Sequence, residues 1–258
     1  MEGAVSQTSQ SSVHNRLLQT LSPEDFHLLQ PHLEHLSVKL RDVLIPPNEP
    51  IEHIHFPEHG IASIVANTND GRRIEVGIFG RDGMSGTAVL LGADQTPHES
   101  FIQVPGAVLR MSADHLREAI RQSPSLHALF LRYVQAFQVQ TAYTALSNGG
   151  YGIEERLARW LLMCHDRLDG DELPLTHEFL GIMLGVRRSS VTLAIQMLEG
   201  AKVIEARRGR LTLVDRAKLE GIAGDSYGTP EAEYERLIAR VGNGSDVGTK
   251  AWDVSEEE

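Results

Sequence analysis

The stretch that decides the fold is LTHEFLGIMLGVRRSSVTLAIQMLEG, residues 175–200. Thr176 is a helix-capping residue, and the apolar residues that follow it recur at the spacing of a helix. Gly185 readily adopts positive φ, which allows a tight turn. A second helix is predicted to begin near Arg188. Two short helices joined by a glycine turn are typical of the helix-turn-helix unit, whose second helix enters the major groove N-terminus first.

The second helix begins with the side chains that DNA recognition needs. Arginine can donate two hydrogen bonds to guanine, and hydroxyl groups reach phosphates or bases. A predicted hairpin over 202–214 follows, with arginines at its tip, which indicates a basic wing. A lone helix-glycine-helix is more often an ordinary helical hairpin, but this whole order favours DNA binding. The residues predicted to contact DNA are Thr176, Arg187, Arg188, Ser189, Ser190, Thr192, Arg207, Arg208 and Arg210.

Charge is distributed unevenly along the chain. The net charge is −11, from 24 Lys+Arg against 35 Asp+Glu. Residues 187–218, however, hold eight basic and three acidic side chains. A local basic region can steer a polyanion although the whole protein is acidic, and the alternative is an ordinary solvated helix face.

Composition excludes several classes of protein. The 258 residues allow one large domain or two ordinary ones. No apolar run approaches the ~20 residues that cross a bilayer, and no secretory signal is visible. The single cysteine, Cys164, excludes an intramolecular disulfide framework and a cysteine-ligated iron–sulfur cluster within one chain. We therefore expect a cytoplasmic protein with no membrane partner.

Residues 37–111 carry a different pattern. Short runs rich in Val, Ile and Phe alternate with turn-forming clusters such as Pro57-Glu58-His59-Gly60, which indicates an antiparallel sandwich or barrel. Asp70-Gly71, between two apolar runs, predicts a hairpin.

A long helix is predicted over 125–146. Six of its positions step by 4, 3, 4, 3 and 4, which is typical of the seam of a two-stranded coiled coil, although a core-facing amphipathic helix is the alternative. We favour a dimer, and we expect the Ser147–Gly150 segment to be a hinge because two adjacent glycines disfavour a helix. The predicted interface residues are Leu126, Phe130, Tyr133, Phe137, Gln140 and Thr144.

These features together resemble the Crp–Fnr family of bacterial transcription regulators over residues ~13–227. The family's Gly–x–(Ser/Arg)–Arg–x–(Ser/Thr)–Val core is present as GVRRSSV, residues 185–191. In that resemblance, Arg188 matches the base-reading arginine of the recognition helix. Ser189 and Leu193 differ from the cyclic-AMP receptor, which has a glutamate and a second base-reading arginine there, so a different operator is expected.

The resemblance implies an α+β fold in three functional parts. These are a cyclic-nucleotide-binding-like, antiparallel β-roll (jelly-roll-like) sensor domain with flanking helices over 13–124, a dimerisation helix over 125–146, and a winged helix-turn-helix domain over 151–228. Residues 1–12 are expected to be disordered, 147–150 to form the hinge, and 229–258 to form an acidic tail. The expected partners are double-stranded DNA, a second copy of the chain, RNA polymerase and an unidentified small-molecule effector.

The sensor lacks the residues that hold a cyclic nucleotide. Nucleotide-binding members are expected to carry a glutamate for the ribose and an arginine for the phosphate, and neither is present in the matching stretches, 83–86 and 96–100. Burying a phosphate without a counter-charge is costly, so binding of cyclic AMP is not expected. The residues that remain as a predicted effector pocket are Gly83, Met84, Ser85, Gly86, His98 and Ser100.

Two further function classes remain open. His53 and His55 lie two apart on a predicted strand, which is adequate for a metal ligand pair and suggests a metal-dependent cupin-like enzyme with an appended helical domain. Solvent-facing strand histidines are the simpler interpretation, and no cofactor, bound metal or catalytic residue is expected. A pure dimerisation or adaptor module is the third class.

Overall fold

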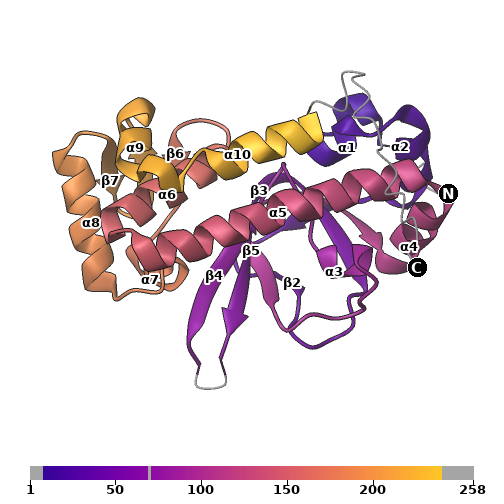
Figure 1. Ribbon diagram of the computed structural model, residues 1–258, viewed down its shortest axis with the longest axis horizontal. Helices are drawn as coiled ribbons and strands as arrows, with labels where there is room; N and C mark the ends of the chain where they lie inside the picture. The colour runs from indigo at the N-terminus through magenta and orange to yellow at the C-terminus, as the bar shows by residue number, and fades with distance from the viewer. Residues whose placement is uncertain (1–7, 69–70, 240–258) are drawn as a thin grey trace, which may run out of the picture.

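The computed structural model describes residues 8–68 and 71–239. A β-rich part and a smaller helical part lie toward opposite ends of the molecule, and α5 (Pro124–Gly150) runs along both of them (Figure 1). This arrangement confirms the predicted α+β class. Within the described residues, no helix is both long and apolar enough to span a bilayer.

The N-terminal part is an antiparallel β-roll closed by helices. Its strands have the order β1-β5-β3-β4, and β2 also pairs with β5. The strands are β1 (Glu34–Val38), β2 (Val43–Ile45), β3 (His53–Asn67), β4 (Arg73–Phe79) and β5 (Glu99–Ser112). The helices are α1 (Arg16–Thr20), α2 (Pro23–Leu29), the 3₁₀ turn η2 (Gln30–His32), α3 (Thr87–Leu90) and α4 (Ala113–Gln122).

Strand β3 is longer than its sequence pattern predicts. The Pro57–Gly60 cluster, expected to form a turn, lies inside β3, where the register with β5 shifts repeatedly. Gly60 has φ +89°, and a Cβ atom there would lie 2.4 Å from the Val104 carbonyl oxygen, so glycine permits the close approach of the two strands. The predicted hairpin is confirmed, because β3 and β4 pair from Ala62–Phe79 to Asn67–Arg73.

The expected disorder of residues 1–12 is wrong for its described portion. Residues 10–12 form the 3₁₀ turn η1 (Gln10–Ser12). The side-chain amide of Gln10 donates hydrogen bonds to the carbonyl oxygens of Leu18 (3.1 Å) and Leu21 (2.9 Å), which ties this segment to α1. Residues 1–7 lie outside the described part of the chain.

Helix α5 differs from the prediction in its end and in its buried face. The helix continues to Gly150, with Tyr151 as its C-cap, so the expected end at residue 146 is wrong and residues 147–150, expected to form a hinge, are helical. The predicted seam faces the chain's own β-roll, where Gln140 Oε1 accepts a hydrogen bond from the Ile78 amide and Phe137 packs beside Gly77. Buried in this way are Leu126, Phe130, Tyr133 and Gln140, while Phe137 and Thr144 are half-buried. The core-facing alternative is therefore correct for these positions.

The second part is a small helical domain with a three-stranded sheet. Its sheet order is β6-β8-β7, formed by β6 (Glu172–Leu173), β7 (Ile204–Arg207) and β8 (Arg210–Leu213). Its helices are α6 (Ile153–His165), α7 (His177–Met183), α8 (Arg188–Gly200) and α9 (Arg216–Ala223), followed by the 3₁₀ turn η3 (Gly224–Ser226). As expected, Cys164 is buried in its core, and burial raises the pKa of the thiol.

The expectation of an acidic tail over 229–258 is wrong for residues 229–239. They form α10 (Thr229–Tyr234) and a π-helical turn, η4 (Glu235–Ala239), which run back beside α5 to α1 (Figure 1). Tyr234 and Ile238 are buried in the core of the β-roll. The Arg16 guanidinium contacts the Glu235 carboxylate and lies 5.2 Å from the centre of the Tyr234 ring. Residues 240–258 lie outside the described part.

Candidate nucleic-acid interface

The local sequence fixes the geometry of the two-helix unit. The Thr176 hydroxyl accepts a hydrogen bond from the Phe179 amide (3.3 Å) and so caps α7. Gly185 has φ +62° in the turn between the helices, as the sequence predicts. Helix α8 begins at Arg188, and its buried stripe packs into the domain core through Val191, Ile195 and Leu198. The stripe holds the opposite face of α8 toward solvent.

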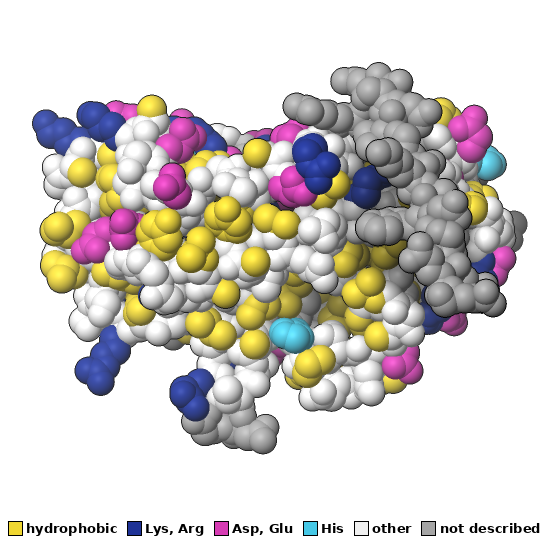
Figure 2. All heavy atoms as spheres, viewed as in Figure 1, with side chains coloured by type: hydrophobic (Ala, Val, Ile, Leu, Met, Phe, Trp, Pro, Cys, Tyr) yellow, Lys and Arg dark blue, Asp and Glu magenta, His cyan; other side chains and the backbone are white. Residues whose placement is uncertain are grey.

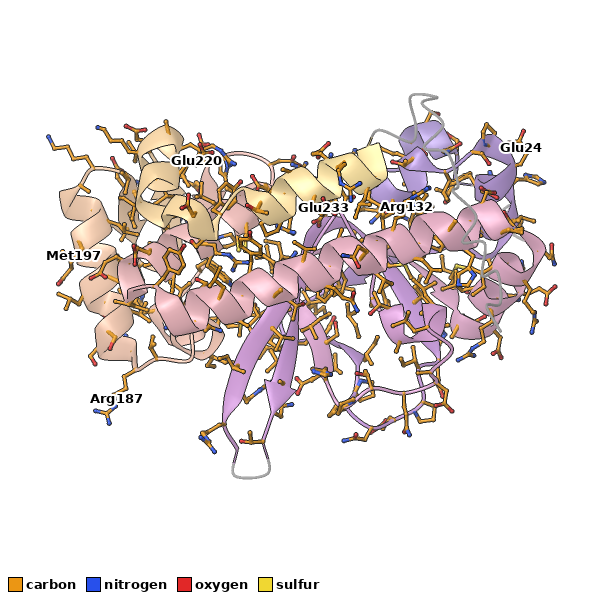
Figure 3. The ribbon with its side chains drawn as sticks, in the orientation of Figure 1. Glu24, Arg132, Arg187, Met197, Glu220 and Glu233 are labelled. Carbon is orange, nitrogen blue, oxygen red and sulfur yellow. The ribbon has the colours of Figure 1, made fainter. Side chains whose placement is uncertain are left out.

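The exposed N-terminal turn of α8 carries the predicted cationic side chains. The side chains of Arg187 and Arg188 are exposed, and neither guanidinium has a hydrogen-bond or salt-bridge partner within the described residues. Arg187 projects away from the body of the protein (Figure 3). Ser189 is exposed and Ser190 half-buried. An unpaired cation at a helix N-terminus that faces solvent is suited to an anionic partner.

The predicted wing lies at the same end of the molecule. Strands β7 and β8 pair through Arg207 and Arg210, and Gly209 has φ +77° in the turn between them. Arg208 is exposed and has no partner within residues 8–68 and 71–239, whereas Arg207 and Arg210 form exposed ion pairs with Glu205 (3.6 Å) and Glu172 (3.1 Å). Exposed pairs of this kind contribute little stability, so both arginines can exchange a carboxylate for a phosphate.

Two predicted contact residues already have intramolecular roles. Thr176 is exposed, but its hydroxyl oxygen caps α7. The Thr192 hydroxyl donates a hydrogen bond to the Arg188 carbonyl oxygen (3.1 Å) and lies 3.1 Å from His177 Nδ1. Sequence reasoning named Leu193 only as a departure from the cyclic-AMP receptor and left it out of the predicted DNA contacts, but it is 56% exposed on the outward face of α8. The available signal was an apolar residue outside the helix's apolar stripe.

Helix α5 leaves one face uncovered after packing on the β-roll and on α10. Leu131 and Leu146 are 38% and 50% exposed. Figure 2 shows apolar side chains gathered in a band along the α5 side of the molecule. Five of the exposed positions step by 4, 3, 4 and 3 residues, and these are Leu131, Gln135, Gln138, Ala142 and Ala145. This face therefore repeats the coiled-coil spacing that the buried face also shows.

The predicted effector-pocket residues are largely packed. The Tyr133 hydroxyl lies against the 83–86 loop, where it accepts a hydrogen bond from the Met84 amide (3.2 Å). Met84 and Ser85 are buried, and the ordered loop continues into Gly86, which has φ +72°. Ser100 is buried on β5, and the His98 ring contacts the Thr96 hydroxyl (3.2 Å). A Cβ atom on Gly83 would lie 2.3 Å from the Tyr133 hydroxyl oxygen.

The histidine pair does not form a metal site with neighbouring ligands. The rings of His53 and His55 lie 6.5 Å apart between centres, and His55 Nδ1 lies 3.1 Å from the Ser85 hydroxyl. Burial lowers the pKa of His55 to about 4, with smaller effects from His53 and Arg110. No group of three or more His, Cys, Asp or Glu side chains suited to a metal ion occurs in the part of the chain that the structure describes.

Buried polar contacts join the β-roll to the helical domain, and sequence reasoning missed them. The Trp160 indole N–H on α6 donates to Glu75 Oε1 on β4 (2.6 Å), and the Ser63 hydroxyl contacts Glu75 Oε2 (2.6 Å). Arg167 forms a buried ion pair with Asp82 (2.6 Å). A cavity of about 350 Å³ beside this pair is bounded by the β-roll, α5 and α10. None of the residues of the predicted effector pocket lines it.

Comparison with known proteins gives two domain matches. A sequence model of the cyclic nucleotide-binding domain matches residues 35–123, and a model of the Crp-like helix-turn-helix domain matches residues 155–222. Together they cover 157 of the 258 residues. A search of curated sequences found no match. The cupin-like alternative gains no support from these matches.

Solved structures share the fold at low sequence identity. FixK2 from Bradyrhizobium japonicum has a TM-score of 0.64 at 16% identity, with 74% of this chain and 98% of that chain covered. A regulator assigned to the Crp/Fnr family from Eubacterium rectale has 0.62 at 17%, with 80% and 97% covered. The c-di-GMP-responsive regulator CLP from Xanthomonas campestris has 0.58 at 18%, with 75% and 99% covered.

Proposed function

The chain belongs to the Crp–Fnr family of DNA-binding transcriptional regulators, and we propose that it binds a near-palindromic operator as a homodimer through α8. The observation that carries this proposal is the solvent-exposed first turn of α8, where Arg187 and Arg188 have no partner within the described residues. The wing, which carries further arginines, lies at the same end of the molecule (Figure 1). Phosphate contacts by the wing would position the helix, and base contacts by α8 would select the sequence.

The exposed face of α5 supports a dimer of a specific form. The uncovered seam runs from Leu131 to Ala145, with the exposed Leu146 beside its end, and it includes the small residues Ala142 and Ala145. Small residues permit two helices to approach closely, and the exposed leucines would lose water on pairing. Parallel pairing of two α5 helices places both copies of α8 at the same end of the dimer. That arrangement suits half-sites whose centres lie ~34–36 Å apart.

The sensor's packing supports regulation without a cyclic nucleotide. Tyr133 occupies the space against the 83–86 loop, and Met84 and Ser85 are buried there. A bound cyclic phosphate would need a buried counter-charge, and these residues supply none. We expect calorimetric titration with cyclic AMP to give no heat of binding. Saturable binding with one site per chain would contradict this part of the proposal.

The test of DNA binding compares two arginine variants. Duplexes are first selected from a random-sequence library with the full chain, and the dissociation constants of selected and random duplexes are then measured at several salt concentrations. Arg188→Ala should weaken binding to the selected duplex by ~1–3 kcal/mol and leave binding to random DNA nearly unchanged. Arg117→Ala, which alters an exposed arginine of α4 that pairs with Asp114, is the control.

Each other outcome has a defined meaning. Equal loss on both duplexes would assign Arg188 to the phosphate backbone. A log–log salt slope near zero would contradict DNA binding altogether, because a protein that neutralises Z phosphates gives a slope of roughly −0.9Z. In that case the chain would be interpreted as a dimerisation or adaptor module instead of a DNA-binding protein.

A further inference from the structure

The recognition helix exposes two large apolar side chains that nothing in the described chain covers. Leu193 and Met197 are 56% and 57% exposed, and they lie one turn apart on α8. The buried stripe of the same helix contains Val191, Ala194 and Ile195. The apolar pair therefore adds nothing to the domain core. Figure 3 shows Met197 directed outward at the end of the molecule that carries α8.

Helical periodicity separates the two exposed residues. At about 100° per residue, Ser189, Leu193 and Gln196 lie nearly opposite the centre of the buried stripe, whereas Met197 lies to one side. Leu193 follows Arg188 by five residues, so it belongs to the N-terminal half of the helix. The N-terminal half of a recognition helix enters the major groove first. Leu193 thus occupies the part of α8 that can reach base edges.

We propose that Leu193 contacts the 5-methyl group of a thymine in the major groove and thereby selects an A·T base pair in each half-site. This inference rests on the proposed function and deepens it. A thymine methyl is the only apolar group that a base pair presents in that groove, and leucine cannot donate or accept a hydrogen bond there.

The charges around Leu193 decide between DNA and a protein as the partner of this surface. Arg187 and Arg188 begin the same helix, and Arg208 lies at the tip of the adjacent wing, all without a partner within the described residues. An apolar protein groove would have to cover these cations, whereas DNA phosphates flank the groove on both sides. An apolar side chain on a helix that also carries unpaired cations therefore suits the major groove, which is flanked by phosphate backbones.

Removal of single methyl groups tests the assignment. In the tightest duplex selected with the full chain, each thymine of one half-site is replaced in turn by deoxyuridine, which lacks only the 5-methyl group. Dissociation constants are measured by fluorescence anisotropy at one fixed salt concentration. The unaltered protein should bind about fourfold more weakly when the contacted methyl is removed. Leu193→Ala should bind the thymine and uracil duplexes at that position equally.

Met197→Ala is the matched control, because it shortens an equally exposed apolar residue of the same helix. It should keep the fourfold dependence on the methyl group. The proposal is overturned if no thymine in the half-site is sensitive to demethylation, or if Leu193→Ala keeps the full sensitivity. It is also overturned if the sensitivity is lost in Met197→Ala instead. Failure to select any sequence from the library would contradict the proposed function itself, which separates the two failures.

Discussion

Replacement of Ile238 by alanine should destabilise the protein although the residue lies in an acidic C-terminal segment. Ile238 is 1% exposed and belongs to the core of the β-roll, where η4 meets α5 and α1. The substitution removes three carbon atoms, which corresponds to about 2.4 kcal/mol of lost transfer free energy at ~0.8 kcal/mol each. Incomplete collapse of the resulting cavity raises the expected loss to about 3–4 kcal/mol.

Urea denaturation followed by circular dichroism measures this loss. Arg236→Ala, two residues away, is the matched control, because its exposed pair with Glu233 should contribute less than about 1 kcal/mol. If Ile238→Ala unfolds within about 0.5 kcal/mol of the unaltered protein, the C-terminal segment does not pack against the β-roll in solution. The interpretation of residues 229–239 as part of the sensor core would then be wrong.

Three further changes test other parts of the structure. Burial raises the pKa of Glu75 to about 7, so the folded state holds a proton that the unfolded chain releases. The free energy of unfolding should therefore fall by up to ~3 kcal/mol between about pH 4.5 and 7. Glu75→Gln should flatten this pH dependence in urea titrations. Tyr234→Phe should leave the melting temperature equal or higher, since the buried hydroxyl has no partner within the described residues, and a lower value would reveal one. Leu131→Arg should convert the dimer to a monomer in sedimentation experiments, and an unchanged mass would exclude the exposed face of α5 as the interface.

The hydrogen-bond chain around Glu75 accommodates a protonated carboxyl group. The Ser63 hydroxyl has one proton but contacts both Glu75 Oε2 and Gln103 Oε1. A protonated Glu75 can donate to Ser63, which then donates to Gln103, while Glu75 Oε1 still accepts from Trp160. Loss of that proton leaves a buried charge at the boundary between the β-roll and α6. This buried charge is the structural cause of the predicted fall in stability with rising pH.

The DNA-binding unit was predictable because each of its signals is local. The cap at Thr176, the positive φ at Gly185 and the helix start at Arg188 depend on residues within a few positions of each other. The hairpin tip at Gly209 is local in the same sense. Local chemistry of this kind leaves few alternative backbone conformations, so the sequence alone was sufficient for the geometry, although the DNA contacts themselves remain predictions.

The face of α5 that packs on the β-roll was not predictable, because the 4-3 spacing occurs on two faces of the helix. Apolar and small residues surround the helix, so a 4-3 repeat can be traced on the face of Phe130 and Tyr133 and again on the face of Leu131. Periodicity tells which residues share a face, but not which neighbour covers it. The continuation of α5 through Gly149 and Gly150 likewise overrides intrinsic helix propensity, a weak preference that tertiary context commonly outweighs.

The buried contacts between the β-roll and α6 limit how a signal can reach the recognition helix. Rotation of α6 away from the sheet would separate Arg167 from Asp82, which form a buried ion pair. It would also remove the Trp160 bond to Glu75. A small molecule that moves the helical domain within one chain must therefore bind the rotated arrangement more tightly, by at least the free energy of the contacts that the rotation breaks. In the proposed dimer, a change in how two α5 helices pair would leave all of these contacts intact, so that interface is the less costly place for a signal to alter the spacing of the two α8 helices.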